Sequence, residues 1–345
     1  MKRTLTTTIA IGTAALALAL AGCEKKKEEG TGGEAAGGSA ESGGSASAPG
    51  AKASPAAVAA TMGAKGFAVF PADSGMLVGI NFQSVRKSGL WSKYKGMVEK
   101  QIAGEMAEFK EACGIDPLTQ LESAIVAANP STDSAVVVVK GINRSALTEC
   151  GKKLAEADGK KIEVTDEGNL SNYKVDGESI WVAWIDDKTM VMAPEKDKDY
   201  LAARVAGTDG LADGSKLMAM LKSVDTGASV YIVGDVAAMG PGAAAMPGAE
   251  GMFASIKLTD GLAVDAGLRF GSAEGAKGMT DMANQQMKAM KGSLPPPFQK
   301  LIDKASIKTV DKDMVVQISL SGSELEEVGK AAEGMMGALG GFGGL

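Results

Sequence analysis

Hydrophobic positions near the start of the folded region predict one strand followed by one long helix. Met76–Phe82 is a short, mostly apolar run and predicts a strand. Gly89–Cys113 predicts a helix, because its apolar positions recur at steps of three or four residues and therefore share one face. These positions are Val98, Ile102, Met106, Phe109 and Cys113. Gly114 follows directly and is typical of a helix end.

Further along the chain, a unit made of strand, turn, strand and helix recurs four times. The units span residues 124–156, 178–206, 252–291 and 306–336. One extra strand precedes each pair of units, Met76–Phe82 in the first case and Ser229–Val236 in the second. This order predicts a tandem duplication into two similar halves, residues 63–214 and 215–336, each near the usual size of a domain. The helical segment Ser215–Val224 is expected to cover the join.

The alternation of side chains within the strands predicts which face is exposed. Ala254, Ile256 and Leu258, on the side expected to be buried, alternate with Phe253, Ser255 and Lys257, on the side expected to be solvated. A period of two is typical of an antiparallel sheet with one solvated face. By contrast, Val136–Val139 and Ile180–Ile185 are apolar throughout, and we expect them to be covered on both faces or to meet the other half. With helices packed on one face of the sheet in each half, the predicted class is α+β.

The N-terminus has the build of a secretory signal. Lys2 and Arg3 precede the apolar run Ile9–Leu20, which is too short to span a bilayer. We therefore expect residues 1–22 to be a signal peptide.

The end of this signal resembles the lipobox of bacterial lipoproteins, through the sequence Leu20-Ala21-Gly22-Cys23. The resemblance implies cleavage between Gly22 and Cys23, a diacylglycerol on the Cys23 sulfur and an acyl chain such as palmitate on its amine. Glu24 is not aspartate, the usual inner-membrane retention signal of that group. The resemblance therefore implies the outer membrane of a Gram-negative bacterium. A free surface cysteine in a cytosolic domain is the alternative.

Three segments are expected to be flexible. Residues 23–62 are rich in Gly, Ser, Ala and Glu. Because such a segment cannot bury enough apolar area to offset its conformational entropy, we expect it to be a disordered tether. In Met239–Gly251, glycine and proline disfavour a helix and predict a mobile loop. The glycine-rich end, residues 337–345, predicts a frayed tail.

Composition argues against several classes of function. The formal net charge is −6, and no Lys or Arg cluster is present that could bind nucleic acid. The chain contains no histidine, which removes the commonest general base and the commonest transition-metal ligand. Paired acids such as Asp186 and Asp187, or Asp311 and Asp313, fall at predicted turns, where Asp is favoured. We therefore predict no catalytic residue, no metal site, no cofactor and no nucleic-acid partner.

The two remaining cysteines, Cys113 and Cys150, are expected to form a disulfide. They are an even number in a chain that the signal directs to an oxidising compartment. A redox-active pair is the alternative, but the CxxC spacing is missing.

Methionine is abundant, with 19 residues, and its placement suggests core packing. Met279, Met282, Met287 and Met290 fall close to one helical stripe, which predicts packing against the sheet. Met220 shares a stripe with Leu217, Leu221 and Val224, and we predict that all of them are core residues. Met218 falls outside this stripe. Thioether binding of copper is a distant alternative.

The region after the tether resembles uncharacterised envelope lipoproteins of Gram-negative bacteria, in its overall plan and in the turn Cys113-Gly114-Ile115-Asp116-Pro117. We predict a lipid-anchored protein with a non-catalytic binding or structural role. Its partners are the membrane, through Cys23, and either another envelope protein or a hydrophobic ligand. Trp91 is a candidate anchor for a protein partner, a carrier of a lipid or hydrophobic ligand is the alternative, and an enzyme of unknown class is a more distant one.

Overall fold

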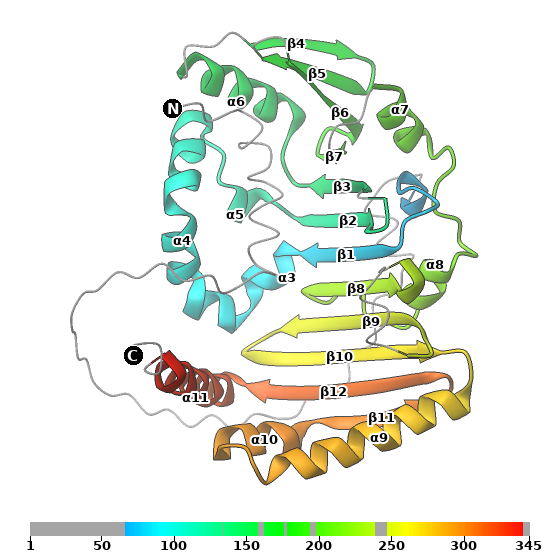
Figure 1. The fold of residues 1–345 in the computed structure, drawn as a ribbon. Coiled ribbons are helices and arrows are strands. Elements are labelled where there is room, and N and C mark those ends of the chain that lie inside the picture. Colours follow the sequence, from blue (N-terminus) through cyan, green and yellow to red (C-terminus); the bar gives the residue numbers. More distant parts are fainter. Residues whose placement is uncertain are drawn as a thin grey trace, which may run out of the picture.

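The computed structural model describes residues 66–132, 134–157, 162–175, 178–193, 198–238 and 247–340. The strands of this part of the chain form one antiparallel sheet in the order β11-β12-β10-β9-β8-β1-β2-β3-β7-β6-β5-β4 (Figure 1). They are β1 Met76–Asn81, β2 Ser123–Asn129, β3 Ser134–Lys140, β4 Ile162–Glu167, β5 Leu170–Val175, β6 Glu178–Asp186, β7 Thr189–Met192, β8 Val230–Asp235, β9 Ala249–Leu258, β10 Gly261–Phe270, β11 Ser306–Val310 and β12 Asp313–Ser321.

The strand order repeats on either side of the central β1–β8 pair. Outward from β1 lie β2, β3, β7 and β6, and outward from β8 lie β9, β10, β12 and β11. The hairpin β4–β5 extends the first side. The predicted α+β class with antiparallel strands is confirmed. Because Leu77 of β1 pairs with Val233 of β8, the sheet is continuous, and two edges that separate sheets would expose are hidden.

Helices lie on both faces of this sheet, with the longer ones on one side. We name the sides the α4 face and the α8 face. The α4 face is covered by α3 Phe82–Lys87, α4 Gly89–Cys113, α5 Pro117–Gln120, α6 Arg144–Ala157, α9 Ala273–Lys291, α10 Pro296–Lys304 and α11 Gly322–Gly340. The α8 face is covered by η1 Gly66–Val69, α7 Lys198–Ala206 and α8 Lys216–Leu221.

The α8 face carries the largest hydrophobic core. Leu77, Val233 and Phe253 lie on this face in neighbouring strands and are buried. Leu217 and Leu221 of α8 belong to the same buried cluster. Met218 and Met220 are also buried there, so the prediction for Met220 is confirmed and that for Met218 is wrong.

Two strand glycines make room for aromatic rings within this core. A Cβ at Gly79 would lie 2.1 Å from the ring of Tyr231, and one at Gly267 would lie 2.4 Å from the ring of Phe253. Glycine in a strand interior commonly marks such a close approach. Burial raises the pKa of the Tyr231 hydroxyl, which has no hydrogen-bond partner among the described residues.

The sequence prediction of the solvated face is wrong for β9. Phe253 and Ser255, on the side expected to be wet, are only 4% and 5% exposed. Ala254 and Ile256, on the side expected to be buried, are half-buried. The physical reason is α8, which contacts β8 and β9 on the Phe253 side. Ser255 Oγ accepts a hydrogen bond from the Asp225 backbone N at 2.8 Å, so its burial costs little.

On the first side of the sheet, both faces are closed. Val137 and Val139 of β3 are buried on the α4 face, in a cluster with Trp184. Val136 and Val138 are buried on the α8 face. The prediction that this strand is covered on both sides is confirmed.

The long helix α4 has the bounds that its sequence predicts. Ser88 Oγ caps its first turn by accepting a hydrogen bond from Trp91 N at 3.0 Å. Gly114 ends it with φ 63°, a left-handed conformation that favours glycine. Cys113 at its C-terminal end is bonded to Cys150 of α6, with Cα atoms 4.4 Å apart. This end of α4 is thus fixed to α6.

Some elements differ from their predictions. The hairpin β4–β5 and the helix α10 were not predicted, and most of β4 is exposed, so its hydrophobic pattern is weak. Helix α8 occupies only part of the predicted segment 215–224, and α11 continues to Gly340, into the predicted tail. The predicted signal, Cys23, the predicted tether and residues 239–246 of the predicted loop lie outside the described residues.

Glu324 gives the stability of this fold a pH dependence. Its carboxylate pairs with Lys304 and accepts hydrogen bonds from the backbone N and Oγ of Ser321, at 2.8 and 2.9 Å. These contacts, that with Lys304 first, lower the pKa of Glu324 from 4.5 to about 2. Since this pKa is lower in the folded state, the contribution is complete above about pH 4.5 and is lost as the pH falls towards 2.

We expect Glu324→Gln to lower the free energy of unfolding by about 1 kcal/mol at neutral pH, a magnitude typical of a capping contact. Urea unfolding of both proteins, at neutral pH and near pH 2, measures the difference. It should shrink as the solution is acidified. A difference that stays constant down to pH 2 would contradict the role of the carboxylate.

Candidate functional site

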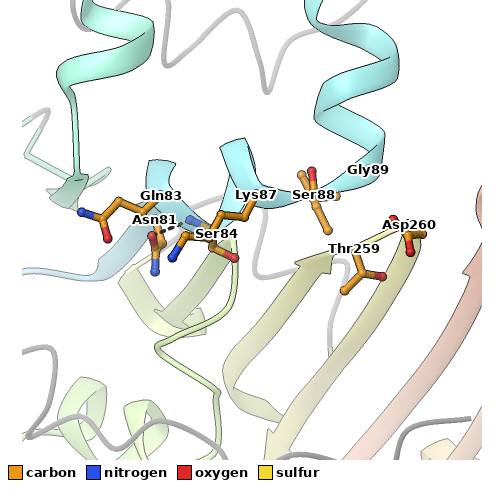
Figure 2. Close-up of a pocket in the computed structure, with 9 residues that line it drawn as sticks. Asn81, Gln83, Ser84, Lys87, Ser88, Gly89, Thr259 and Asp260 are labelled. Carbon is orange, nitrogen blue, oxygen red and sulfur yellow. Dashed lines mark hydrogen bonds between the residues drawn. The ribbon is translucent and has the colours of Figure 1, made fainter.

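A cleft of about 500 Å³ opens where α3 meets α4 (Figure 2). It is lined by Asn81, Gln83, Ser84, Lys87, Ser88, Gly89, Leu258, Thr259 and Asp260. The first six come from the end of β1, from α3 and from the start of α4, whereas the last three come from the end of β9 and the turn after it. The cleft therefore joins segments from the two sides of the β1–β8 pair.

Hydrogen bonds of small polar side chains fix the position of α3 in this cleft. Asn81 Oδ1 caps α3 by accepting a hydrogen bond from Ser84 N at 2.9 Å. Ser84 Oγ and the buried Ser229 Oγ lie 3.0 Å apart. Ser229 Oγ also accepts a hydrogen bond from Leu258 N at 3.0 Å. Ser229 thus ties α3 to the end of β9.

The turn between β9 and β10 packs on the first turn of α4. Leu90 N donates a hydrogen bond to Thr259 O at 3.1 Å. A Cβ at Gly89 would lie 2.2 Å from Asp260 Oδ1, so the carboxylate lies close against this glycine. The position suits a negative charge, because the N-terminal end of a helix is partially positive. The carboxylate of Asp260 therefore lies at the wall of the cleft, beside the start of α4.

Lys87 and Asp260 are the charged side chains that line the cleft. Within the described part of the chain, neither forms a hydrogen bond or an ion pair through its side chain. Figure 2 shows Lys87 beside the other α3 side chains and Asp260 on the opposite side, next to Gly89. One positive and one negative group are thus available to a ligand.

Leu258 connects this cleft with an apolar surface on the α4 face. Two rows of paired residues cross β1, β8, β9, β10 and β12, and we name them the apolar rows. The first is Ile80, Val230, Ile256, Val264 and Ile318, and the second is Val78, Ile232, Ala254, Ala266 and Val316. Leu258 lies on the same face of β9, next to Ile256 in the alternation. A molecule could therefore contact the cleft and the rows together.

The apolar rows are incompletely covered. Except for Val78, all their side chains are half-buried, whereas on the opposite face of the same strands Leu77, Tyr231, Val233 and Phe253 are at most 4% exposed. Two of the helices on this side pack loosely, since α10 buries none of its residues and α9 buries only Ala276 and Thr280. An extended apolar surface that keeps contact with solvent is typical of an interaction site.

The methionines of α9 do not form the core stripe that their spacing predicts. Met282 and Met290 are 44% and 55% exposed, and Met279 and Met287 are half-buried. The prediction is wrong for Met282 and Met290, because the small residues Ala276 and Thr280 are the buried residues of α9 instead, and Thr280 contacts β11. Thr309 of β11 donates a hydrogen bond to Thr280 at 2.9 Å.

Of the acidic pairs, Asp186 has the predicted turn role, whereas Asp313 begins β12 and pairs across the sheet with Arg269 of β10. Asp186 accepts hydrogen bonds from Lys188 N and Thr189 Oγ1, at 2.8 and 3.0 Å, and so stabilises the β6–β7 turn. Asp313 forms a bidentate pair with Arg269. Among the described residues, no group of three or more His, Cys, Asp or Glu side chains could hold a metal ion. In the same part of the chain, no helix is long and apolar enough to cross a membrane.

Sequence reasoning did not single out the residues of the cleft. Trp91, the predicted anchor for a protein partner, is half-buried near it. The unit 252–291, which contains Asp260, and the start of the long helix at Gly89 are each predicted from local signals, but nothing in the sequence indicates that they meet. Cys113 and Cys150 lie at the other end of α4, away from the cleft.

Comparisons with known proteins find similarity only among solved structures. No protein-family model matches the chain, and no curated protein sequence matches it. The chain is similar to the solved structures of TP0453 in crystal forms I, III and IV, with TM-scores of 0.42, 0.43 and 0.46 and sequence identities of 12%, 12% and 9%. Each match covers 76% of this chain and 95–96% of TP0453.

Proposed function

We propose that this protein is an envelope lipoprotein, anchored to a membrane through Cys23, that binds the acyl chains of a lipid on its apolar rows without catalysis. The observation that supports binding is the contrast in burial between the two faces of β1, β8 and β9. The α8 face is closed by its own helices, whereas the apolar rows stay half-buried. Of the functions that the sequence left open, this contrast favours the carrier of a hydrophobic ligand.

An acyl chain matches the chemistry of the apolar rows. Their side chains are Val, Ile and Ala, which offer no hydrogen bond and so cannot orient a polar ligand. Covering them with hydrocarbon gains about 0.8 kcal/mol for each buried methylene group. A tether of residues 23–62 would have a root-mean-square reach of roughly 35 Å, so the anchored protein could meet lipids of its own membrane.

The test uses the whole mature chain from residue 23, with Cys23→Ser, exported so that disulfides can form. This variant carries no acyl chain of its own that could occupy the rows. Organic extraction of the purified protein, followed by mass spectrometry, should release a stoichiometric lipid. Ile256→Lys places a charge in the first row and should abolish this lipid, because burying an unpaired ammonium against hydrocarbon is costly.

Val310→Lys is the matched control, since Val310 is 45% exposed on β11 outside the rows. It should retain the lipid. The Cys23→Ser protein without a further substitution, if it is empty after incubation with envelope lipids, would refute the proposal. Equal lipid content in Ile256→Lys and the control would refute the assignment to the apolar rows.

A further inference from the structure

The cleft lies at one end of the apolar rows and differs from them in chemistry. Leu258 belongs to the wall of the cleft and to the apolar side of β9. The remaining side chains of the cleft are polar or charged. A ligand whose hydrocarbon lies on the rows would therefore place its polar end among Gln83, Lys87 and Asp260.

The charges of the cleft are of opposite sign and lie on different elements. Lys87 ends α3, whereas the carboxylate of Asp260 lies beside Gly89 at the start of α4. Because neither has a partner among the described residues, each can pair with a ligand without breaking a contact of the protein. A single anionic headgroup would satisfy Lys87 and be repelled by Asp260.

The geometry points to a zwitterionic phospholipid with a primary amine as the ligand, its phosphate at Lys87 and its ammonium at Asp260. This inference rests on the proposed binding of acyl chains. An ammonium group donates hydrogen bonds to a carboxylate, which a quaternary amine cannot do. The amide of Gln83, which is exposed at the cleft, can donate to the phosphate oxygens.

Short-chain lipids that are monomeric in water separate recognition of one molecule from adsorption to a membrane. We would titrate dihexanoyl phosphatidylethanolamine, phosphatidylcholine and phosphatidylglycerol, and dihexanoylglycerol, into the mature chain with Cys23→Ser by calorimetry. The ethanolamine lipid should bind most tightly. Lys87→Gln should weaken its binding about five-fold, as expected for a partly exposed ion pair, and leave dihexanoylglycerol unchanged.

Asp260→Asn should weaken binding of the ethanolamine lipid to a similar extent. It should strengthen binding of dihexanoyl phosphatidylglycerol, because it removes a charge that repels this anionic lipid. Lys308→Gln and Asp213→Asn are matched controls at exposed positions outside the cleft and should change neither affinity. Thermal unfolding of each variant verifies that it is folded.

Each outcome bears on one level of the inference. If all lipids bind alike and neither cleft variant changes the affinities, headgroup recognition is refuted while the proposed function stands. If no lipid binds, including dihexanoylglycerol, the proposed function is refuted as well. If glycerophosphoethanolamine without acyl chains binds as tightly as the lipid, the ligand is a free phosphate ester, and the phospholipid is refuted.

Discussion

Shortening Phe253 to alanine should lower the free energy of unfolding by about 3–5 kcal/mol, whereas shortening Ile256 on the same strand should lower it by only about 1 kcal/mol. Phe253 is 4% exposed and packs over Gly267 on the closed α8 face, so its removal leaves a cavity. Ile256 is half-buried in the apolar rows, and water can replace the methyl groups that are lost. From the residue types alone, one would expect both substitutions to lower the free energy of unfolding by several kcal/mol.

Urea unfolding of protein freed of lipid measures both losses. Adding a short-chain lipid should then stabilise the wild type more than Ile256→Ala, because a ligand that binds only the folded state adds to its stability according to its affinity. Phe253→Ala should keep the full stabilisation by lipid, since its side chain lies on the opposite face. A loss of several kcal/mol for Ile256→Ala would show that the rows are a closed core, and would remove the support for an apolar ligand.

The local parts of this fold could be predicted from the sequence. The bounds of α4 follow from its helical period and from Gly114, and the bounds of β1 follow from one apolar run. Such signals are local, because capping and side-chain period act within a few residues. The hairpin β4–β5 escaped prediction because it lies at the edge of the sheet and most of β4 is exposed.

The pairing of β1 with β8 could not be predicted in the same way. These strands are far apart in the sequence, and the contact of Leu77 with Val233 leaves no local pattern. The cleft depends on this pairing, because it brings α3 and Gly89 next to the β9–β10 turn. For this reason Lys87 and Asp260 looked like isolated surface charges in the sequence.

Alternation in a strand shows which residues share a face, but not which face is covered. In β9 the alternation correctly places Ile256 and Phe253 on opposite faces of the sheet. The assignment of the wet side failed because the coverage depends on where α8 and the C-terminal helices dock. The more uniformly apolar side of β9 is the open one, and this difference carries the functional proposal.

The described contacts of α4 lie at its two ends. Where the exposure of its side chains is described, none is buried, although Leu90, Trp91, Tyr94 and Val98 are half-buried. Its N-terminal end is held by the hydrogen bond from Leu90 N to Thr259 O, and Lys93 pairs with Glu326 of α11. Its C-terminal end is bonded covalently to α6.

Replacing Cys113 and Cys150 together by alanine should therefore lower the free energy of unfolding by about 3–4 kcal/mol and should also loosen the C-terminal end of α4 within the folded protein. The bond closes a loop across a separation of 37 residues, and its loss gives the unfolded chain more conformational freedom. In hydrogen exchange, the amides of the C-terminal half of α4 should lose protection in the double variant, while those of β3 keep theirs.

The exported chain with Cys23→Ser is the parent protein for this comparison, so that only two thiols are in question. Its unfolding curve should shift on addition of a reductant, whereas that of the double alanine variant should not. Alkylation without reductant should label neither thiol of the parent. Labelling of both thiols in the native protein would contradict the bond, and α4 would then need another contact to hold its C-terminal end near Ile142 and Cys150, which are buried in one cluster with Ile115.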